Sequence, residues 1–287
     1  MYYPGCTVKR NAIEYERSAI AILNKLGINV IELPKWYCCG ALYSLATDNL
    51  AKHLGAVRTL ISAEESAGVH KTNRLLTLCP MCFNVLKRVH ILLKNDPEKL
   101  GTINQYLGDE NKQYRGTVDV IHVVEILRDR LADLKKLVKR KLDSVKVTVY
   151  YGCTIVRPKE IGVDNPDDPR IIEDILRELG LEVVDLPFKT YCCGAYHILD
   201  KPNIVYGNSS KILRHAIDKG ASIIVTVCPL CLYNLEATLE KTGHKPTIRV
   251  MYLTELIAYI LGLDGAISKI NLDYLNKFFQ SSLHKNS

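Results

Sequence analysis

Short runs of apolar and β-branched residues alternate along the chain with longer segments in which apolar residues recur at helical spacing. The runs that predict strands are residues 29–33, 75–78, 147–150, 181–184 and 223–227. The helical pattern is clearest over residues 14–26 and 171–179, and a glycine, the residue that most often ends a helix, follows each segment. Alternating strands and helices are typical of a parallel sheet covered by helices.

The cysteines divide the chain into two related halves. They form two sets of five: Cys6, Cys38, Cys39, Cys79 and Cys82, then Cys153, Cys192, Cys193, Cys228 and Cys231. The sequence YCCGA at residues 37–41 recurs at 191–195, and the motif CPxC at 79–82 recurs at 228–231. Cysteines that correspond are 147 to 154 residues apart, so the register between the halves drifts by only a few residues. We interpret this pattern as an internal duplication.

The duplication predicts two domains, residues 1–143 and 144–287. The expected fold class is α/β, with two pseudo-symmetric, Rossmann-like domains, each a small parallel sheet with flanking helices. Ligands of such sheets bind beyond the carboxyl ends of the strands. Because the cysteine groups follow predicted strands, we expect the five cysteines of each half to converge at that edge.

The amino-acid composition and the expected cellular location restrict the kinds of chemistry that these cysteines can have. The 287 residues are 47% hydrophobic and 24% charged, which excludes a disordered, collagenous or mucin-like chain. No apolar run approaches the ~20 residues that span a bilayer, and the first ten residues lack the pattern of a signal peptide. We therefore expect a cytoplasmic protein, in which cysteines stay reduced. The ten cysteines then indicate metal or redox chemistry and not disulfides.

Three kinds of site fit cysteines in this pattern. A zinc site needs only four ligands, which CPxC and two further cysteines in one or both halves would supply. A dithiol redox site at CPxC would leave three cysteines in each half without a role. An iron–sulfur site uses more of them. Because an ordinary cubane cluster takes four cysteines and adjacent cysteines diverge along the backbone, five per half favour a polynuclear cluster with an atypical ligand set.

The order and spacing of the motifs resemble the duplicated CCG pattern of the heterodisulfide reductase family, in its B-type subunits. Between Cys6 and Cys38 lie 31 residues, and 38 lie between Cys153 and Cys192. The words LPKWYCCGA at 33–41, YRG at 114–116 and YGCTIVRP at 151–158 agree as well. The 39 residues between Cys39 and Cys79 exceed the mid-thirties usual in the family, which leaves the shape of the first site less defined. The resemblance covers nearly the whole chain.

The resemblance implies two non-cubane 4Fe-4S clusters, each held by the five cysteines of one half; one cluster plus one zinc is the alternative. In that family, such clusters receive electrons singly through a ferredoxin-like iron–sulfur partner protein and cleave a disulfide substrate reductively. The chain has no GxGxxG motif and nothing resembling a flavin site. Partner subunits, one iron–sulfur protein and in a larger complex a flavoprotein, are therefore expected to supply the electrons.

Three residues outside the cysteine sets are of interest for chemistry. His197, four residues after Cys193, is a candidate proton donor near the second site, or an ordinary polar residue after the CCG turn. Arg157 could hold a substrate carboxylate or sulfonate, or make a surface ion pair. His122 is assigned no chemistry, because Tyr252 stands at the corresponding place in the second half.

A second function fits the same pattern. An archaeal type of succinate dehydrogenase has a similar cysteine-rich subunit, which relays electrons towards quinone and attaches the complex to the membrane. In that case a predicted basic helix over residues 128–141 and an apolar tail over 267–283, with Leu272, Leu275, Phe278 and Phe279, would lie on the inner face of the membrane. The ordinary alternatives are a solvated helix and a tail packed against the protein itself or a partner.

The net charge of the chain is +7, and all of the excess lies in residues 1–143. This distribution favours an acidic partner or an anionic membrane surface over nucleic acid, for which no binding motif is present. A zinc-stabilised scaffold without redox activity is the structural alternative to both redox functions.

Overall fold

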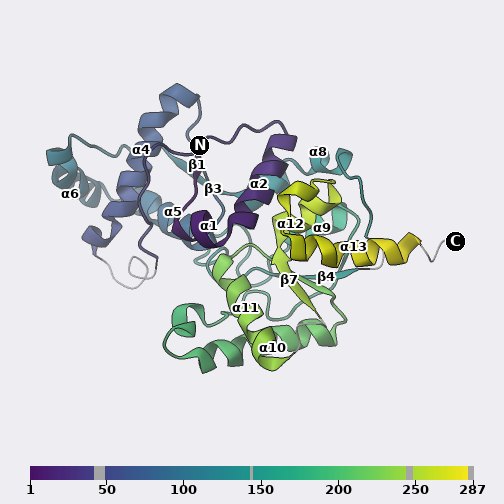
Figure 1. The fold of residues 1–287 in the computed structure, drawn as a ribbon. Helices are drawn as coiled ribbons and strands as arrows, with labels where there is room; N and C mark the ends of the chain where they lie inside the picture. The colour runs from purple at the N-terminus through teal and green to yellow at the C-terminus, as the bar shows by residue number, and fades with distance from the viewer. Residues whose placement is uncertain (42–48, 143–144, 244–247, 284–287) are drawn as a thin grey trace.

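Two parallel sheets flanked by helices form the framework of the computed structural model, which describes residues 1–41, 49–142, 145–243 and 248–283 (Figure 1). The first sheet has the order β1-β2-β3, with β1 at Tyr2–Tyr3, β2 at Arg74–Thr77 and β3 at Asp119–His122. The second has the order β5-β4-β6-β7, with β4 at Lys146–Tyr150, β5 at Glu182–Val183, β6 at Ile223–Thr226 and β7 at Arg249–Tyr252. The predicted α/β class is confirmed.

The described helices follow the strands in both halves. In the first half they are α1 (Cys6–Asn11), α2 (Ile13–Lys25), η1 (Leu50–His53), α4 (Leu54–His70), α5 (Pro80–Asn95), α6 (Pro97–Leu107), η2 (Gly108–Glu110), α7 (Val123–Asp129) and α8 (Leu131–Lys136). In the second they are α9 (Ile171–Glu178), η3 (Ala195–Ile198), α10 (Pro202–Asp218), α11 (Pro229–Thr242), α12 (Leu253–Ile260), η4 (Asp264–Ala266) and α13 (Lys269–Leu283). Four of the five predicted strands and the helices predicted over 14–26 and 171–179 appear within a few residues of their expected bounds.

The predicted strand at residues 29–33 is reduced to a single bridge, between Glu32 and Tyr2. Tyr2 N–H donates to the Ile31 carbonyl at 2.7 Å, and Leu33 N–H donates to the Tyr2 carbonyl at 2.9 Å. The partner strand β1 is only two residues long, and the next residue on this side, Pro34, has no N–H to continue the ladder. Its counterpart β5 pairs with the longer β4 and therefore forms a strand.

The single basic helix predicted over residues 128–141 is wrong. The helix breaks at Arg130, whose φ of −107° and ψ of 19° lie outside the helical region, and α8 ends at Lys136. The chain then crosses to the end of α12, where the N–H groups of Lys139 and Arg140 donate to the Ile260 carbonyl at 2.9 and 3.0 Å. The Arg140 guanidinium pairs with Asp264. These tertiary contacts outweigh the helical preference of the Lys-rich segment.

Two pairs of helices form the interface between the halves, and each pair has one helix from each half. α2 of the first half packs against α12 of the second (Figure 1). α9 of the second half packs against α7 of the first. Since α9 follows β4 as α2 follows β1, and α12 follows β7 as α7 follows β3, the interface is related to itself by a pseudo-twofold axis. Buried apolar side chains form one continuous core across it, from Leu23 through Val147 to Leu256. The predicted boundary at residues 143–144 lies outside the described residues.

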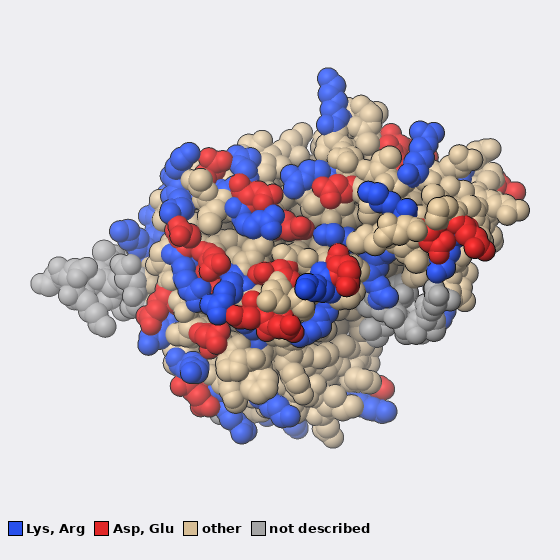
Figure 2. Space-filling model, turned by 180° about the vertical axis from the view of Figure 1, so that it is seen from behind, with Lys and Arg blue, Asp and Glu red and all other residues tan. Residues whose placement is uncertain are grey.

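Helix α13, which covers most of the predicted apolar tail, packs on the protein's own core. Leu275 is fully buried, and Leu272 and Phe278 are partly buried against the same core. The side chain of Phe279 lies outside the described part of the chain. Among the described helices, none has both the length and the apolar character needed to cross a bilayer. On the face seen in Figure 2, Lys and Arg side chains intermingle with Asp and Glu.

Candidate metal centres

Cysteines stand at the carboxyl ends of both sheets, in matching positions. Cys6 and Cys153 each come three residues after the ends of β1 and β4, and Cys79 and Cys228 each come two residues after β2 and β6. Cys79 and Cys228 are the N-cap residues of α5 and α11, with a proline at the first helical position of each helix. The positive end of the helix dipole of α5 or α11 therefore lies at each of these residues.

The first site, defined by Cys6, Cys38, Cys39, Cys79 and Cys82, is open on one side. Cys6 and Cys38 are exposed, and their sulfurs are 3.9 Å apart. The other three cysteines are buried. The Cys38 and Cys82 thiols hydrogen-bond to Cys39 and lower the pKa of Cys39 to about 3, whereas the pKa values of Cys38 and Cys82 are raised, chiefly by the same hydrogen bonds. These hydrogen bonds therefore favour the thiolate form at Cys39 over Cys38 and Cys82.

The second site, defined by Cys153, Cys192, Cys193, Cys228 and Cys231, is more enclosed. Cys153 and Cys192 are partly buried and the other three are buried, with 3.8 Å between the Cys193 and Cys231 sulfurs. Hydrogen bonds from Cys153 and then Cys193 lower the pKa of Cys192 to about 2. The pKa of Cys228 is lowered as well, chiefly by the hydrogen bond from Cys231. One cysteine of each CCG motif, Cys39 in the first half and Cys192 in the second, has a lowered pKa.

A glycine precedes the first cysteine of each set and gives the sulfurs room. Gly5 and Gly152 both have φ of +70°, a conformation that side chains disfavour. A Cβ atom at Gly5 would lie 3.0 Å from Cys82 Sγ, and one at Gly152 would lie 2.9 Å from Cys231 Sγ. Any larger residue would push into the second sulfur of CPxC. The space that these glycines leave open is part of both cysteine sites.

The residues after each cysteine pair form a left-handed turn that aims N–H groups at sulfur. Ala41 and Ala195 have φ of 42° and 49°, a conformation that is strained for alanine. The Gly194 N–H donates to Cys192 Sγ at 3.4 Å, and the Ala41 N–H contributes to the lowered pKa of Cys39. The CCGA sequence therefore stabilises negative charge on the sulfurs in both halves.

Two buried tyrosines that the sequence reasoning missed fix the cysteine pairs. Tyr3 OH donates to the Tyr37 carbonyl at 2.8 Å, and Tyr150 OH donates to the Tyr191 carbonyl at 2.7 Å. Each phenol lies among the sulfurs of its own half, and burial is the largest cause of its raised pKa, followed by those sulfurs. The signal was a tyrosine three residues before the first cysteine of each set, which makes Tyr150 the counterpart of Tyr3.

Two asparagines that follow CPxC, Asn84 two residues after Cys82 and Asn234 three residues after Cys231, have different partners. Asn234 donates from Nδ2 to Cys193 Sγ at 3.2 Å and to the Ala195 carbonyl at 2.9 Å, within its own half. Asn84 donates instead to the carbonyls of Thr154 and Arg157, at 2.7 and 2.6 Å, in the other half. The first asparagine therefore holds the segment after Cys153, while the second donates directly to a sulfur.

His122 and a stacked tyrosine pair lie between the two sites. The Leu78 carbonyl, next to Cys79, accepts from His122 Nε2 at 2.6 Å and from Tyr15 OH at 2.9 Å. Burial lowers the pKa of His122 to about 4, so the imidazole is neutral and positions the backbone. The Tyr15 ring stacks on Tyr252 with 4.4 Å between centroids, and both phenols have sulfur neighbours from Cys79 and Cys228.

The other two residues of interest for chemistry, His197 and Arg157, lie close to the sites but do not enter the cysteine sets. The His197 side chain is half exposed, and its Nδ1 lies 3.3 Å from Asp200 Oδ1. The neighbouring Tyr196, which the sequence reasoning missed, has cysteines of both halves among the groups that raise its pKa after burial. Arg157 makes no surface ion pair among the described residues; its guanidinium donates to the Thr190 and Pro166 carbonyls, at 3.0 and 2.9 Å.

The donor sets fit iron–sulfur clusters by their chemistry. Thiolate ligands select iron–sulfur clusters, zinc or copper(I), and N–H groups directed at sulfur are the usual second set of contacts around such clusters. In each half a glycine leaves space beside the sulfurs, and the CCGA turn directs N–H groups at a sulfur. Among the described residues, no three His, Cys, Asp or Glu side chains are arranged as a site for one metal ion.

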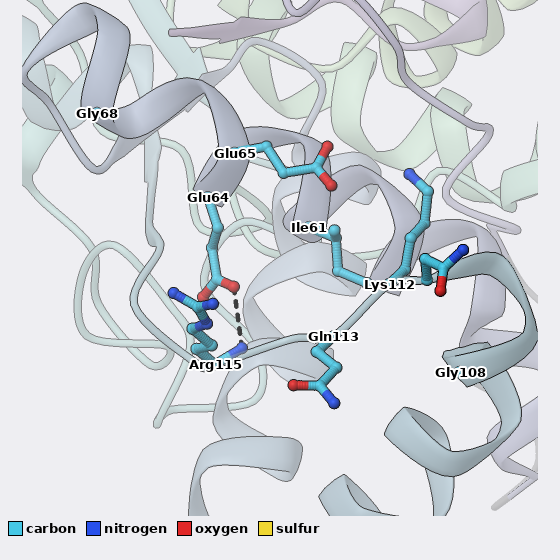
Figure 3. Close-up of a pocket in the computed structure, with 9 residues that line it drawn as sticks. Ile61, Glu64, Glu65, Gly68, Gly108, Lys112, Gln113 and Arg115 are labelled. Atoms are coloured by element: carbon cyan, nitrogen blue, oxygen red, sulfur yellow. Dashed lines mark hydrogen bonds between the residues drawn. The ribbon is translucent and has the colours of Figure 1, made fainter.

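A cavity of about 630 Å³ lies away from the cysteines, between α4 and the segment after α6 (Figure 3). Glu64 accepts hydrogen bonds from the N–H groups of Arg115 and Thr117 at 2.9 and 2.7 Å, which ties that segment to α4. Glu65 and Lys112 also line the cavity. Its lining is mixed in charge and holds no cysteine.

Comparison with known proteins identifies relatives along the whole chain. The family described as a cysteine-rich domain, CCG, matches residues 1–87 and 147–236. The membrane anchor subunit of 8-methylmenaquinol:fumarate reductase from Wolinella succinogenes is 32% identical, over 91% of this chain and 92% of that protein. The B-type subunit of the ferredoxin/F(420)H(2)-dependent CoB-CoM heterodisulfide reductase from Methanosarcina acetivorans is 28% identical, over 98% of this chain and 97% of that protein.

A crystal structure of a hypothetical protein from Helicobacter pylori shares the fold. It matches with a TM-score of 0.69 at 13% identity, over 91% of this chain. The match spans about half, 48%, of the Helicobacter chain. At this identity the likeness concerns the fold alone.

Proposed function

The chain belongs to the CCG family of cysteine-rich domain proteins, and we propose that each of its halves holds one non-cubane 4Fe-4S cluster. The resemblance to the B-type subunits of heterodisulfide reductase is confirmed by relatives from two Methanosarcina species, and the chain is accordingly an iron–sulfur redox subunit. One observation carries the proposal for the clusters. Five thiols gather at the same edge of each sheet, with a glycine space and directed N–H groups repeated in both halves.

In this proposal all ten cysteines are ligands. The first site holds one cluster and the second site holds the other, with the ligand sets as defined above. When bound, the clusters would take up and release electrons one at a time. The chain's own groups hold the ligands in place: Tyr3 and Tyr150 fix the cysteine pairs, and His122 fixes the carbonyl next to Cys79.

The proposed reaction is the reductive cleavage of a small disulfide or a related sulfur substrate. Two electrons and two protons convert one disulfide into two thiols, so the S–S bond breaks and each sulfur gains one proton. A ferredoxin-like iron–sulfur subunit, with a flavoprotein in a larger complex, is proposed as the electron source. His197 is the proposed proton donor, and its Nδ1 contact with Asp200 would orient the ring.

A second candidate is an electron relay between an iron–sulfur partner and a quinone pool. The relative from Wolinella succinogenes, a membrane anchor subunit of a menaquinol-dependent fumarate reductase, favours it. In this candidate the chain lies peripherally on the cytoplasmic face of the membrane as part of a succinate or fumarate oxidoreductase. Attachment through α13 would have to use residues other than Leu275, because that side chain is buried in the core.

Iron and acid-labile sulfide analysis of anaerobically prepared protein tests the clusters. We expect about eight irons and eight sulfides per chain, with a paramagnetic signal on oxidation that differs from that of a cubane cluster. One or two zinc ions without iron would contradict the clusters and the redox function. Four irons with one zinc would restrict the cluster to one half.

The assembled complex separates the two reactions. Thiol release from a supplied heterodisulfide, without quinol oxidation, would identify the reductase. Oxidation of a menaquinol analogue together with binding to anionic liposomes, without thiol release, would identify the relay. The isolated chain is not sufficient for this test, because the electrons enter through the iron–sulfur partner.

A further inference from the structure

A cavity of about 470 Å³ lies where the two halves meet. We name it the junction cavity. Asn84 and Arg88 of α5, in the first half, form one wall. Thr154, Arg157 and Lys159, in the segment after Cys153, form the other wall. Neither half could form this cavity alone.

The lining of the junction cavity has an excess of positive charge. Arg88, Arg157 and Lys159 contribute three cations, and Asp167 is the one carboxylate among the residues that line it. Within the described residues, neither Arg88 nor Lys159 has an ion-pair partner. Arg157 donates only to neutral acceptors, the carbonyls of Thr190 and Pro166 and the Thr190 hydroxyl. With one carboxylate against three cations, the lining keeps a net positive charge.

Hydrogen bonds hold the cavity in shape. The buried Asn84 amide donates to the Thr154 and Arg157 carbonyls, at 2.7 and 2.6 Å, and so joins the two walls. The bonds from Arg157 to Thr190 and Pro166 fix its guanidinium over the same segment. Arg157 is therefore preorganised and would lose little conformational entropy when an anion binds.

The matching place on the other side of the pseudo-twofold axis is built differently. There α11 meets α1. Counted from the cysteines, Arg10 stands at the place of Arg157, but Ala237 and Ala12 stand at the places of Arg88 and Lys159. Two of the three cations therefore have no counterpart on the other side of the axis, and they are not a by-product of the duplication.

We propose that the junction cavity binds a phosphate or sulfonate group. Arginine binds such tetrahedral oxyanions through several charge-assisted hydrogen bonds at once. The group would belong either to a small soluble molecule or to the headgroup of an anionic lipid. Asn84 lies two residues after Cys82, and Thr154 follows Cys153, so the bound group would lie beside both cysteine sites. This inference goes beyond the proposed function, since anion binding needs no electron transfer.

The first arm of the test measures binding of inorganic phosphate, pyrophosphate and methanesulfonate to the full, anaerobically prepared chain by calorimetry and by the shift in melting temperature. We expect Arg88→Gln combined with Lys159→Gln to weaken binding by about tenfold or more, because two charge-assisted hydrogen bonds are lost. Lys112→Gln, in the cavity of Figure 3, is the matched control and should leave the affinity unchanged.

The second arm identifies the source of the anionic group. Vesicles of phosphatidylcholine with phosphatidylglycerol are compared with pure phosphatidylcholine in co-sedimentation with the same variants. Lipid binding that the double substitution abolishes, with Lys112→Gln unaffected, assigns a headgroup. Loss of phosphate, pyrophosphate or methanesulfonate binding alone assigns a soluble ligand.

Two results would overturn the anion site. In the first, the double variant binds every probe as the unsubstituted chain does. In the second, Lys112→Gln weakens binding as much as the double substitution, which would show a diffuse charge effect. Equal melting temperatures of all variants without ligand exclude loss of folding, since Arg88 is only half-buried and Lys159 is exposed. Iron content is measured separately, so failure of the anion site is distinguishable from failure of the proposed function.

Discussion

In the first half, Cys6 and Cys38 are exposed, whereas their counterparts Cys153 and Cys192 are partly buried. The sequence motifs around the two sites are nearly the same, and the three inner cysteines of each set are buried in both halves. The difference comes from the surroundings. After Cys6 the chain enters α1 directly, whereas after Cys153 it runs through an irregular segment before α9 begins at Ile171. Duplicated motifs therefore set which atoms bind, while the connecting segments set how accessible they are.

The largest expected effect comes from removing one inner cysteine in either half. Cys39→Ser and Cys193→Ser should each lower the iron content from about eight to about four per chain, because each site would hold its own 4Fe-4S cluster. Metal analysis of the two variants beside the unsubstituted chain measures this. Loss of all iron from either variant would show that the two sites do not load independently.

The difference in exposure predicts two rates of iron removal. A hydrophilic chelator should take iron from the first site several-fold faster than from the second, because only the first site has exposed cysteines, Cys6 and Cys38. Absorbance of the iron–chelator complex against time follows both phases. The fast phase should be absent from Cys39→Ser and retained in Cys193→Ser. A single phase in the unsubstituted chain would contradict the comparison.

The glycine spaces should be equally important in both halves. Gly5→Ala and Gly152→Ala place a Cβ at 3.0 and 2.9 Å from sulfur, in addition to the ~1–2 kcal/mol cost of a left-handed alanine. We expect cluster content to fall in the altered half. Gly27→Ala and Gly180→Ala are matched controls, since their φ values are +73° and +89° and a Cβ there meets nothing within 4 Å. If the controls lose as much iron, backbone strain and not the sulfur contact is responsible.

His122 should make stability more sensitive to acid than its counterpart Tyr252 does. Burial lowers the pKa of His122 from 6.5 to about 4, so the unfolded chain takes up a proton in this pH range and the folded chain does not. The stabilisation is complete above pH 6.5 and is lost as the pH falls towards 4, by up to about 3 kcal/mol. In anaerobic thermal unfolding, His122→Asn should flatten this dependence, and Tyr252→Phe should not. Equal pH profiles of His122→Asn and the unsubstituted chain would exclude this role.

The smallest expected effect distinguishes the two asparagines. Asn234→Leu removes an N–H donor from Cys193 Sγ and should lower the reduction potential of the second centre by about 40 mV, the equivalent of roughly 1 kcal/mol for one electron. Asn84→Leu removes no donor to sulfur and should leave both potentials unchanged. Redox titration followed by paramagnetic resonance measures both. Equal shifts in the two variants would mean that the contacts differ without a functional difference.

Local patterns were sufficient to predict much of the architecture. The strands at 75–78, 147–150 and 223–227 could be predicted because each is a continuous buried run, and the cysteine motifs follow two of them directly. The predicted helix over 128–141 failed because the chain is drawn to the end of α12, a contact more than a hundred residues away. The helix propensity of a local segment cannot predict a contact at that distance along the chain.

The contacts that hold the site were also beyond local reasoning. Asn84 and Asn234 lie one residue apart in the repeat, in the first turns of α5 and α11, and only the three-dimensional arrangement shows that they donate to different halves. The acceptor for Tyr3, the Tyr37 carbonyl, is fixed by the path of a loop 34 residues along the chain. The ten cysteines were recognisable by spacing, whereas the residues that position them depend on tertiary contacts.

The reciprocal packing of α2 with α12 and of α9 with α7 has a consequence for the ancestry of the chain. A surface that meets its own copy about a twofold axis is the interface of a symmetric dimer. A one-domain ancestor with this interface would have paired with a second copy of itself. Because one gene encoded both copies, every substitution would have appeared in both. Fusion of the genes removed that restriction, and Arg88 could then diverge from its counterpart Ala237 while the shared interface stayed intact.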